Sequence, residues 1–72
     1  MFIKSQKIAA AHVSLFLRQT SSGYRWELQI LADSAAEHSV EQSAITHTSP
    51  SEALNAGFER FEAALRALNS TR

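Results

Sequence analysis

The chain has 72 residues, and its seven basic residues balance its seven acidic ones. A chain of this length forms one domain, residues 1–72, whose small core leaves oligomerisation as the most accessible source of extra stability. It has no cysteine and no run of ~18 apolar residues, which excludes disulfides, thiolate metal sites and membrane-spanning helices and is compatible with the cytoplasmic location that we expect.

The first strand is predicted after an N-terminal lead-in. We interpret residues 1–8 as an extended or flexible lead-in, with a short N-terminal helix as the alternative. The side chains that follow are apolar at alternate positions, which is the period of a half-buried strand: Val13, Leu15 and Leu17. The small polar cluster 20–23 ends in glycine and predicts a turn.

The second strand has the clearest alternation in the chain, with large apolar side chains at Tyr24, Trp26, Leu28 and Ile30. Two registers of the resulting hairpin keep the apolar side chains on one face, with Leu17 opposite either Trp26 or Leu28. We favour Leu28, because that register sets Arg18 opposite Glu27 and separates two arginines.

A third strand is predicted at residues 40–48, after a polar loop at residues 32–39. Its alternation is poor, because Val40 and Ile45 fall on opposite faces. A bulge would repair the pattern and an edge position would tolerate it, so we expect one or both in this strand.

A capped amphipathic helix is predicted from Ser49 to Leu68. Ser49 suits the N-cap, Pro50 suits the first helical position, and Glu52 completes a capping box. Gly57 lies inside this helix at a cost of about 1 kcal/mol relative to alanine, which a close approach to the sheet would explain. One apolar stripe faces the sheet, with a coiled-coil seam as the alternative use: Leu54, Phe58, Phe61, Leu65 and Leu68.

These elements predict an α+β fold, in which a three-stranded antiparallel meander packs one face against the C-terminal helix and residues 69–72 form a frayed tail. We expect a core of Val13, Leu15, Leu17, Tyr24, Trp26, Leu28, Ile30, Leu54, Phe58, Phe61, Leu65 and Leu68. The alternative for the two strand aromatics, Tyr24 and Trp26, is a base-stacking platform.

The sequence shows no catalytic or metal-binding pattern. The spacing of His12, His38 and His47 does not suit a zinc site. No serine stands in a nucleophile elbow, and carboxylate pairs such as Glu59 and Glu62 are typical of a solvated helix face. We therefore predict that the protein is not an enzyme and holds no cofactor or metal.

The outer face of the sheet is the expected interaction surface. Phe16 is a large ring that points away from the helix, and we expect Leu31 and Ile45 beside it. We predict that a partner binds through Phe16, Arg18, Arg25 and Glu27. The predicted function is a non-catalytic protein-binding or regulatory module that forms a homodimer through a sheet edge or through this outer face.

A small nucleic-acid-binding regulator, antitoxin-like or associated with transcription, is the alternative function. It would use Lys4, Lys7, Arg18 and Arg25. The balanced net charge argues against this function, because each phosphate contact requires a lysine or an arginine.

The segment from Thr46 to Ala56 resembles the strand-to-helix passage of HicB-type antitoxins, in which a threonine precedes a glutamate-alanine-leucine helix start. The resemblance covers this segment alone, and much of it is generic helix capping. The proline- and glycine-containing segment that this family has between its second and third strands is missing here. The resemblance therefore implies no site residue.

Overall fold

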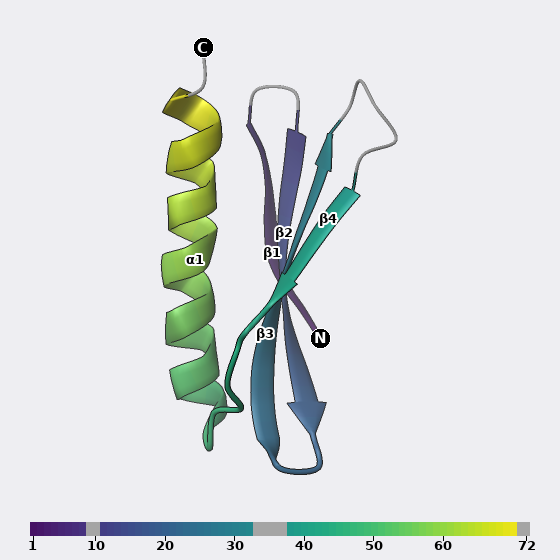
Figure 1. Ribbon diagram of the computed structural model, residues 1–72, viewed down its shortest axis with the longest axis vertical. Helices are drawn as coiled ribbons and strands as arrows, with labels where there is room; N and C mark the ends of the chain where they lie inside the picture. Colours follow the sequence, from purple (N-terminus) through teal and green to yellow (C-terminus); the bar gives the residue numbers. More distant parts are fainter. Residues whose placement is uncertain (9–10, 33–37, 71–72) are drawn as a thin grey trace.

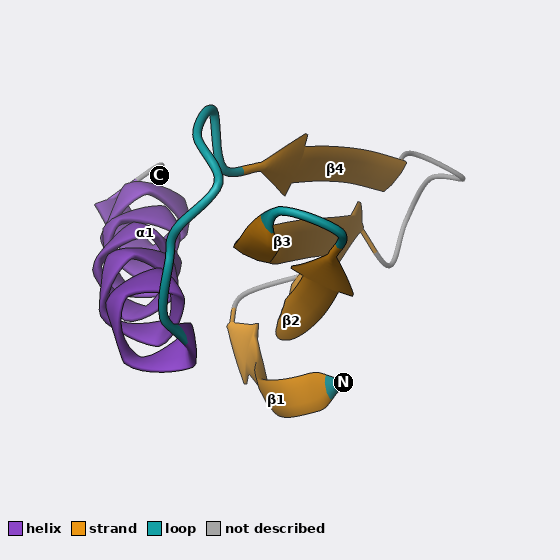
Figure 2. Ribbon diagram, turned by 90° about the horizontal axis from the view of Figure 1, so that it is seen from below, coloured by secondary structure: helices purple, strands orange, loops and turns teal. Residues whose placement is uncertain are grey.

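The computed structural model describes residues 1–8, 11–32 and 38–70. The elements are β1 (Phe2–Ile8), β2 (Ala11–Thr20), β3 (Gly23–Ala32), β4 (His38–Gln42) and α1 (Pro50–Ser70). The strands form one antiparallel sheet in the order β1-β2-β3-β4, and α1 lies along one of its faces (Figures 1 and 2). The predicted α+β class, with an antiparallel sheet and one C-terminal helix, is confirmed. No helix in the described ranges has the combined length and apolarity needed to cross a membrane.

The prediction of three strands is wrong, because residues 2–8 form a fourth strand instead of a lead-in. This strand, β1, pairs antiparallel with β2, and Phe2 lies opposite Phe16. The register of the pair shifts between Phe2 and Lys4. This irregularity interrupts the alternation of inward and outward side chains at the start of the strand. From Lys4 onward the pairing is regular, but two of the positions on the helix side hold the polar residues Lys4 and Gln6. The apolar period of two that reveals a strand is therefore not visible in this segment.

β4 lies at an edge of the sheet, which is one of the two expectations drawn from the poor alternation of residues 40–48. It begins earlier than predicted, because residues 38 and 39, assigned to a loop, already pair with β3. It also ends earlier, at Gln42. Residues 33–37 of the predicted loop lie outside the described residues.

The chain leaves the sheet after β4 and touches it again before the helix. The N–H of Ser43 donates to the carbonyl of Trp26 at 3.0 Å, and His47 exchanges two backbone hydrogen bonds of 2.8 Å with Tyr24. The chain therefore uses four residues, from Ser43 to His47, to run alongside two residues of β3, from Trp26 to Tyr24. Residues 44–46 form a protrusion that takes up the difference, which is how the structure resolves the faulty alternation.

The favoured register of the β2–β3 hairpin is wrong. Leu17 lies opposite Trp26, not Leu28, and the ladder continues until Thr20 lies opposite Gly23. A turn of two residues, both serines, therefore closes the hairpin. A connection this short fixes the register by its own geometry, which outweighs the preference for opposite charges across the strands.

Gly23 occupies a position where the hairpin turn meets the returning chain. Its φ of 151° is one that other residues rarely adopt. A Cβ at this position would collide with the carbonyl oxygen of His47. Glycine therefore permits both the turn and the backbone pairing of residue 47 beside it.

The predicted helix is confirmed, and it begins as its cap predicts. α1 starts at Pro50, and Oγ of Ser49 accepts a hydrogen bond of 3.2 Å from the backbone N–H of Glu52. This bond satisfies one of the donors that a helix leaves unpaired at its first turn. The helix ends at Ser70, two residues beyond the predicted end, and the last two residues of the chain lie outside the described part.

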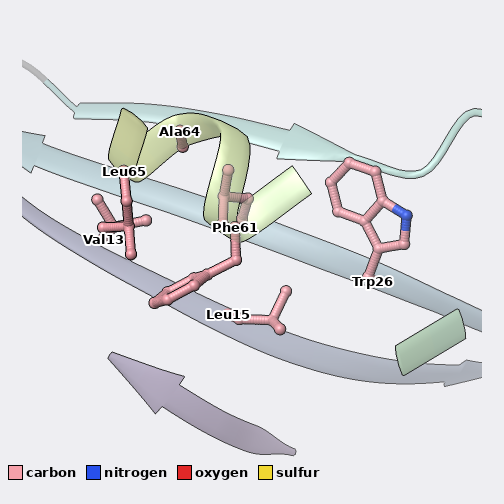
Figure 3. Packing of buried hydrophobic residues seen from close by; sticks show 7 residues of the cluster. Val13, Leu15, Trp26, Phe61, Ala64 and Leu65 are labelled. Atoms are coloured by element: carbon pink, nitrogen blue, oxygen red, sulfur yellow. The ribbon is translucent and has the colours of Figure 1, made fainter. Parts of the chain in front are cut away.

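The core lies between α1 and the two central strands (Figure 3). The largest fully buried side chains are Phe61, Leu15, Leu28 and Val13. In Figure 3 the ring of Phe61 lies beside Val13 and Leu15 of β2. Trp26 is 9% exposed and belongs to the same cluster, which confirms its assignment to the core.

The buried stripe of α1 is made of smaller residues than predicted. Phe58 is 37% exposed, and four other predicted core residues are half-buried: Tyr24, Ile30, Leu54 and Leu68. Three small helix residues are buried instead: Ala53, Gly57 and Ala64. A Cβ at Gly57 would lie 2.9 Å from the Cβ of Trp26. The expected close approach of helix and sheet at Gly57 is therefore confirmed.

Long charged side chains connect the two edge strands to α1. From β1, Nζ of Lys4 lies 5.0 Å from the ring centroid of Phe61 and 5.8 Å from that of Phe58. From β4, the carboxylate of Glu41 accepts hydrogen bonds of 2.8 and 2.9 Å from Nε of Arg60. One helix covers the width of about two strands, and these long side chains extend its contacts to the outer strands. β1 also packs Ile3 and Ile8 against the core.

Candidate interaction surface

The sheet face opposite α1 is covered by no described element (Figure 2). Side chains alternate along each strand, so the pairing register decides which residues point to this side. We call the set the open face: Phe2, Ser5 and Lys7 of β1, His12, Ser14, Phe16 and Arg18 of β2, Arg25, Glu27, Gln29 and Leu31 of β3, and Val40 and Gln42 of β4.

All four predicted partner-binding residues lie on the open face. Phe16 is opposite Glu27, and Arg18 is opposite Arg25, so the four form one contiguous block. They share a face although the favoured register was wrong. The favoured and the observed register differ from each other by two residues, so they keep the same side chains on the same side of the sheet. That these residues bind a partner stays a prediction.

Glu27 is the centre of a hydrogen-bond network within this face. Nε of Arg18 donates to its Oε1 at 3.1 Å, and Nη2 donates to Oε2 at 3.2 Å. Gln29 donates to Oε2 at 2.6 Å, and Gln42 donates to Oε1 at 3.2 Å. Glu27 is only 6% exposed. A buried carboxylate is tolerated here because both of its oxygens accept hydrogen bonds. Two of these four hydrogen bonds come from the cationic guanidinium of Arg18.

The Arg18–Glu27 ion pair, which was the reason for favouring the other register, is formed in the observed register. Arg18 and Glu27 are diagonal neighbours on adjacent strands, offset by two residues from direct opposition. Long side chains span such a diagonal. Charge pairing therefore does not distinguish the two registers of this hairpin, whereas the length of the turn does.

The network lowers the pKa of Glu27 from 4.5 to about 2. The hydrogen bonds from Arg18 and then from Gln29 have the largest effect, burial acts in the opposite direction, and the charge of Arg18 and the hydrogen bond from Gln42 contribute less. The same contact raises the pKa of Arg18. Glu27 is therefore ionised at neutral pH, and its charge is matched within the face.

Phe16 belongs to an aromatic and cationic cluster. The ring of Phe2 meets it edge to face, with centroids 5.7 Å apart and an interplanar angle of 71°. The guanidinium carbon of Arg18 lies 5.6 Å from the Phe16 centroid. The expected neighbours were wrong: Leu31 lies further along β3, and Ile45 belongs to the protrusion after β4.

The sequence prediction did not include Phe2, Val40 or Gln42 in this surface. Phe2 is 56% exposed and Val40 is 49% exposed. Phe2 was missed because polar residues at helix-side positions of β1, together with the register shift next to Phe2, hide the strand that places it. Gln42 and Val40 were missed because the alternation of the region around β4 did not identify which face each residue occupies.

The described residues contain no group of three or more His, Cys, Asp or Glu side chains that could hold a metal ion. Comparison of the chain with known protein families, with characterised proteins and with solved structures gave no match. We therefore infer function from the composition and geometry of the open face.

Proposed function

We propose that the protein is a non-catalytic protein-binding module that holds its partner on the open face and acts in the cytoplasm. The observation that carries this proposal is the block formed by Phe2, Phe16, Arg18 and Glu27. Phenylalanine and arginine are enriched in protein interfaces. Covering Glu27 with a partner carries little desolvation penalty, because the face itself already satisfies its carboxylate.

The distribution of exposed apolar side chains supports the same face. Phe2, Leu31 and Val40 are 56%, 50% and 49% exposed, and all three lie on the open face. On α1, the exposed large apolar side chain within the described residues is Phe58, at 37%. Met1 and Ile45, which are 70% and 63% exposed, belong to neither set. The open face therefore offers a partner more exposed large apolar side chains than α1 does.

A double substitution, Phe16→Ala with Arg25→Ala, tests the proposal. We expect it to abolish partner capture from source-cell lysate while the circular dichroism spectrum stays unchanged. The matched control is Phe58→Ala with Arg66→Ala, which removes the same residue types from α1. Capture that survives the first pair, or that is lost equally with the control pair, contradicts the assignment of the open face.

Self-association is a separate part of the proposal, and we assign it to a sheet edge. Each edge strand, β1 and β4, pairs with a single described strand. An antiparallel contact between two copies of β4 centred on Val40 sets Glu41 opposite Ser39, so no like charges meet in this register. Analytical ultracentrifugation should show a dimer. A monomer at high micromolar concentration would contradict this part without affecting the open face.

Nucleic-acid binding is the second candidate, favoured by the presence of Lys7, Arg18 and Arg25 on the open face. The fourth predicted cation, Lys4, lies instead on the helix side, over the rings of Phe58 and Phe61. This candidate predicts an affinity that falls steeply as salt is raised. A gel shift at low salt with no retained DNA or RNA would dismiss it.

A further inference from the structure

We infer that a second copy of the chain covers the exposed side chain of Val40 by pairing with the free edge of β4, which leaves the aromatic block around Phe16 for a different protein. This inference rests on the self-association part of the proposed function. Leu31 and Val40 are 50% and 49% exposed, and both lie on the open face. Val40 lies opposite Gln29, two residues from Leu31, so the two apolar side chains are diagonal neighbours at the β4 side of the face.

The backbone of β4 presents hydrogen-bonding groups at its free edge. The N–H of Ser43 donates to the carbonyl of Trp26, and these two residues continue the register of the β3–β4 ladder. Bonded and non-bonded pairs alternate along an antiparallel ladder, so this bond fixes which residues of β4 bond to β3. The others point their N–H and C=O groups away from β3, where no described strand lies: His38, Val40 and Gln42.

The opposite edge of the sheet, β1, is less suited to pairing. Its register with β2 shifts between Phe2 and Lys4, so the groups along its free side are unevenly spaced. Such irregularities are one of the devices that keep edge strands from pairing with other chains. β4 pairs with β3 in one register throughout. The regular edge of this sheet is therefore β4.

A second copy of β4 matches this edge when the two strands run antiparallel and the two-fold axis passes between the two Val40 residues. Each Val40 then exchanges both backbone hydrogen bonds with the Val40 of the other copy, and His38 of one copy exchanges its bonds with Gln42 of the other. The outward-pointing backbone groups of β4 are all paired in this arrangement. The same strand therefore supplies both sides of the contact.

The side chains favour the same arrangement. Residues directly opposite each other in a sheet share a face, so the two Val40 side chains meet on the open face as a branched aliphatic pair. With Leu31 of each copy they form one apolar row across the axis. The backbone of α1 approaches β1, β2 and β3 but not β4, so the helix does not stand between the joined edges. Both open faces then lie on one side of a single continuous sheet.

Disulfide crosslinking tests the contact. The chain has no cysteine, so an introduced cysteine is its single thiol. Val40→Cys places two thiols at the axis, where the Cα atoms of a hydrogen-bonded pair lie about 5.5 Å apart, within the range that a disulfide spans. We expect mild oxidation to convert Val40→Cys to a covalent dimer. Ser5→Cys on β1 and Asn55→Cys on α1, which are also exposed positions, should stay uncrosslinked.

A proline at the same position gives a second test. Val40→Pro removes an N–H that points away from β3, so the protein should keep its circular dichroism spectrum and sediment as a monomer. Ser39→Pro is the matched control, because it removes an N–H that bonds to β3 and should lower the melting temperature. If Val40→Pro does not fold, the crosslinking of Val40→Cys decides alone.

The inference is overturned if Ser5→Cys or Asn55→Cys crosslinks as fully as Val40→Cys, or if the dimer survives Val40→Pro. A dimer in ultracentrifugation without the Val40→Cys crosslink retains self-association and rejects this contact. Monomers of the wild-type chain without that crosslink reject the second copy and leave the β4 edge to a strand of another protein. None of these results alters the test of the open face by Phe16→Ala with Arg25→Ala.

Discussion

The two faces of this sheet both bury side chains, but they do so by different means. On the face toward α1, Leu15 and Leu28 are buried because a second layer excludes water from them. On the open face, Glu27 is almost as well buried, yet no described element lies over it. Its cover comes from neighbouring polar side chains of the same sheet, Arg18 and Gln29 among them. Burial alone therefore does not identify the core of a small two-layer domain.

The difference has an energetic consequence. The covered face depends on shape, because apolar side chains in a packed layer tolerate neither cavities nor extra atoms. The open face depends on matched hydrogen bonds and charge, which water partly replaces when a group is removed. We therefore expect substitutions toward α1 to alter stability most, and substitutions on the open face to alter stability less and partner binding more.

Phe61→Ala should have the largest effect on stability. Phe61 is fully buried, and truncating a buried phenylalanine leaves a cavity that costs about 3–5 kcal/mol. Urea denaturation measures the loss, and Phe61→Leu provides a milder variant if the alanine protein does not fold. The control is Phe58→Ala at 37% exposure. Equal losses for the two phenylalanines would contradict the observed orientation of α1.

Gly57→Ala should destabilise the protein by about 1–2 kcal/mol, although alanine is the better helix former. The added Cβ would lie 2.9 Å from the Cβ of Trp26 and 3.1 Å from Cδ1 of Leu15. The Cβ of Trp26 is attached to the strand, so it moves only with the backbone. Asn55→Ala, at an exposed helix position, isolates the propensity effect and should be mildly stabilising. A higher melting temperature for Gly57→Ala would contradict the close approach.

Glu27→Gln should cost about 1 kcal/mol at neutral pH, because the ionic hydrogen bonds from Arg18 are lost. The folded-state pKa of Glu27 is lowered from 4.5 to about 2, so its contribution to stability is complete above pH 4.5 and is lost as the pH falls toward 2. The difference between wild type and variant, followed by urea denaturation across this range, should shrink in acid. Glu59→Gln is the control for the change in net charge. If the stability difference between wild type and Glu27→Gln did not change with pH, the ionic hydrogen bonds assigned to Glu27 would be contradicted.

Arg60→Ala should have the smallest effect, below about 1 kcal/mol. The side chains of Arg60 and Glu41 are 39% and 46% exposed, so water competes with their ion pair. The loss should shrink further as salt is raised, because exposed charges are screened. Double-mutant cycles with Glu41→Ala measure the coupling. A coupling larger than the effect of Gly57→Ala would place more of the stability in the edge contacts than in the packed layer.

The sequence by itself determined the hairpin, the capped helix and the division of β2 and β3 into an apolar and a polar face. Alternation, capping and turn residues act over a few neighbouring positions, so they can be read without the fold. The same local patterns placed Phe16, Arg18, Arg25 and Glu27 on one surface, and their common face survived an error in register.

Tertiary structure decided the rest. The register depended on a two-residue turn, β1 depended on pairing across a register shift, and the rotation of α1 depended on how closely Gly57 approaches Trp26. Membership of Phe2 and Gln42 in the open face followed from strand pairing at the two edges. These features arise from contacts between residues that are distant along the chain. The energies of these contacts depend on how side chains fit together and satisfy one another's hydrogen bonds, so local patterns of residue type do not reveal them.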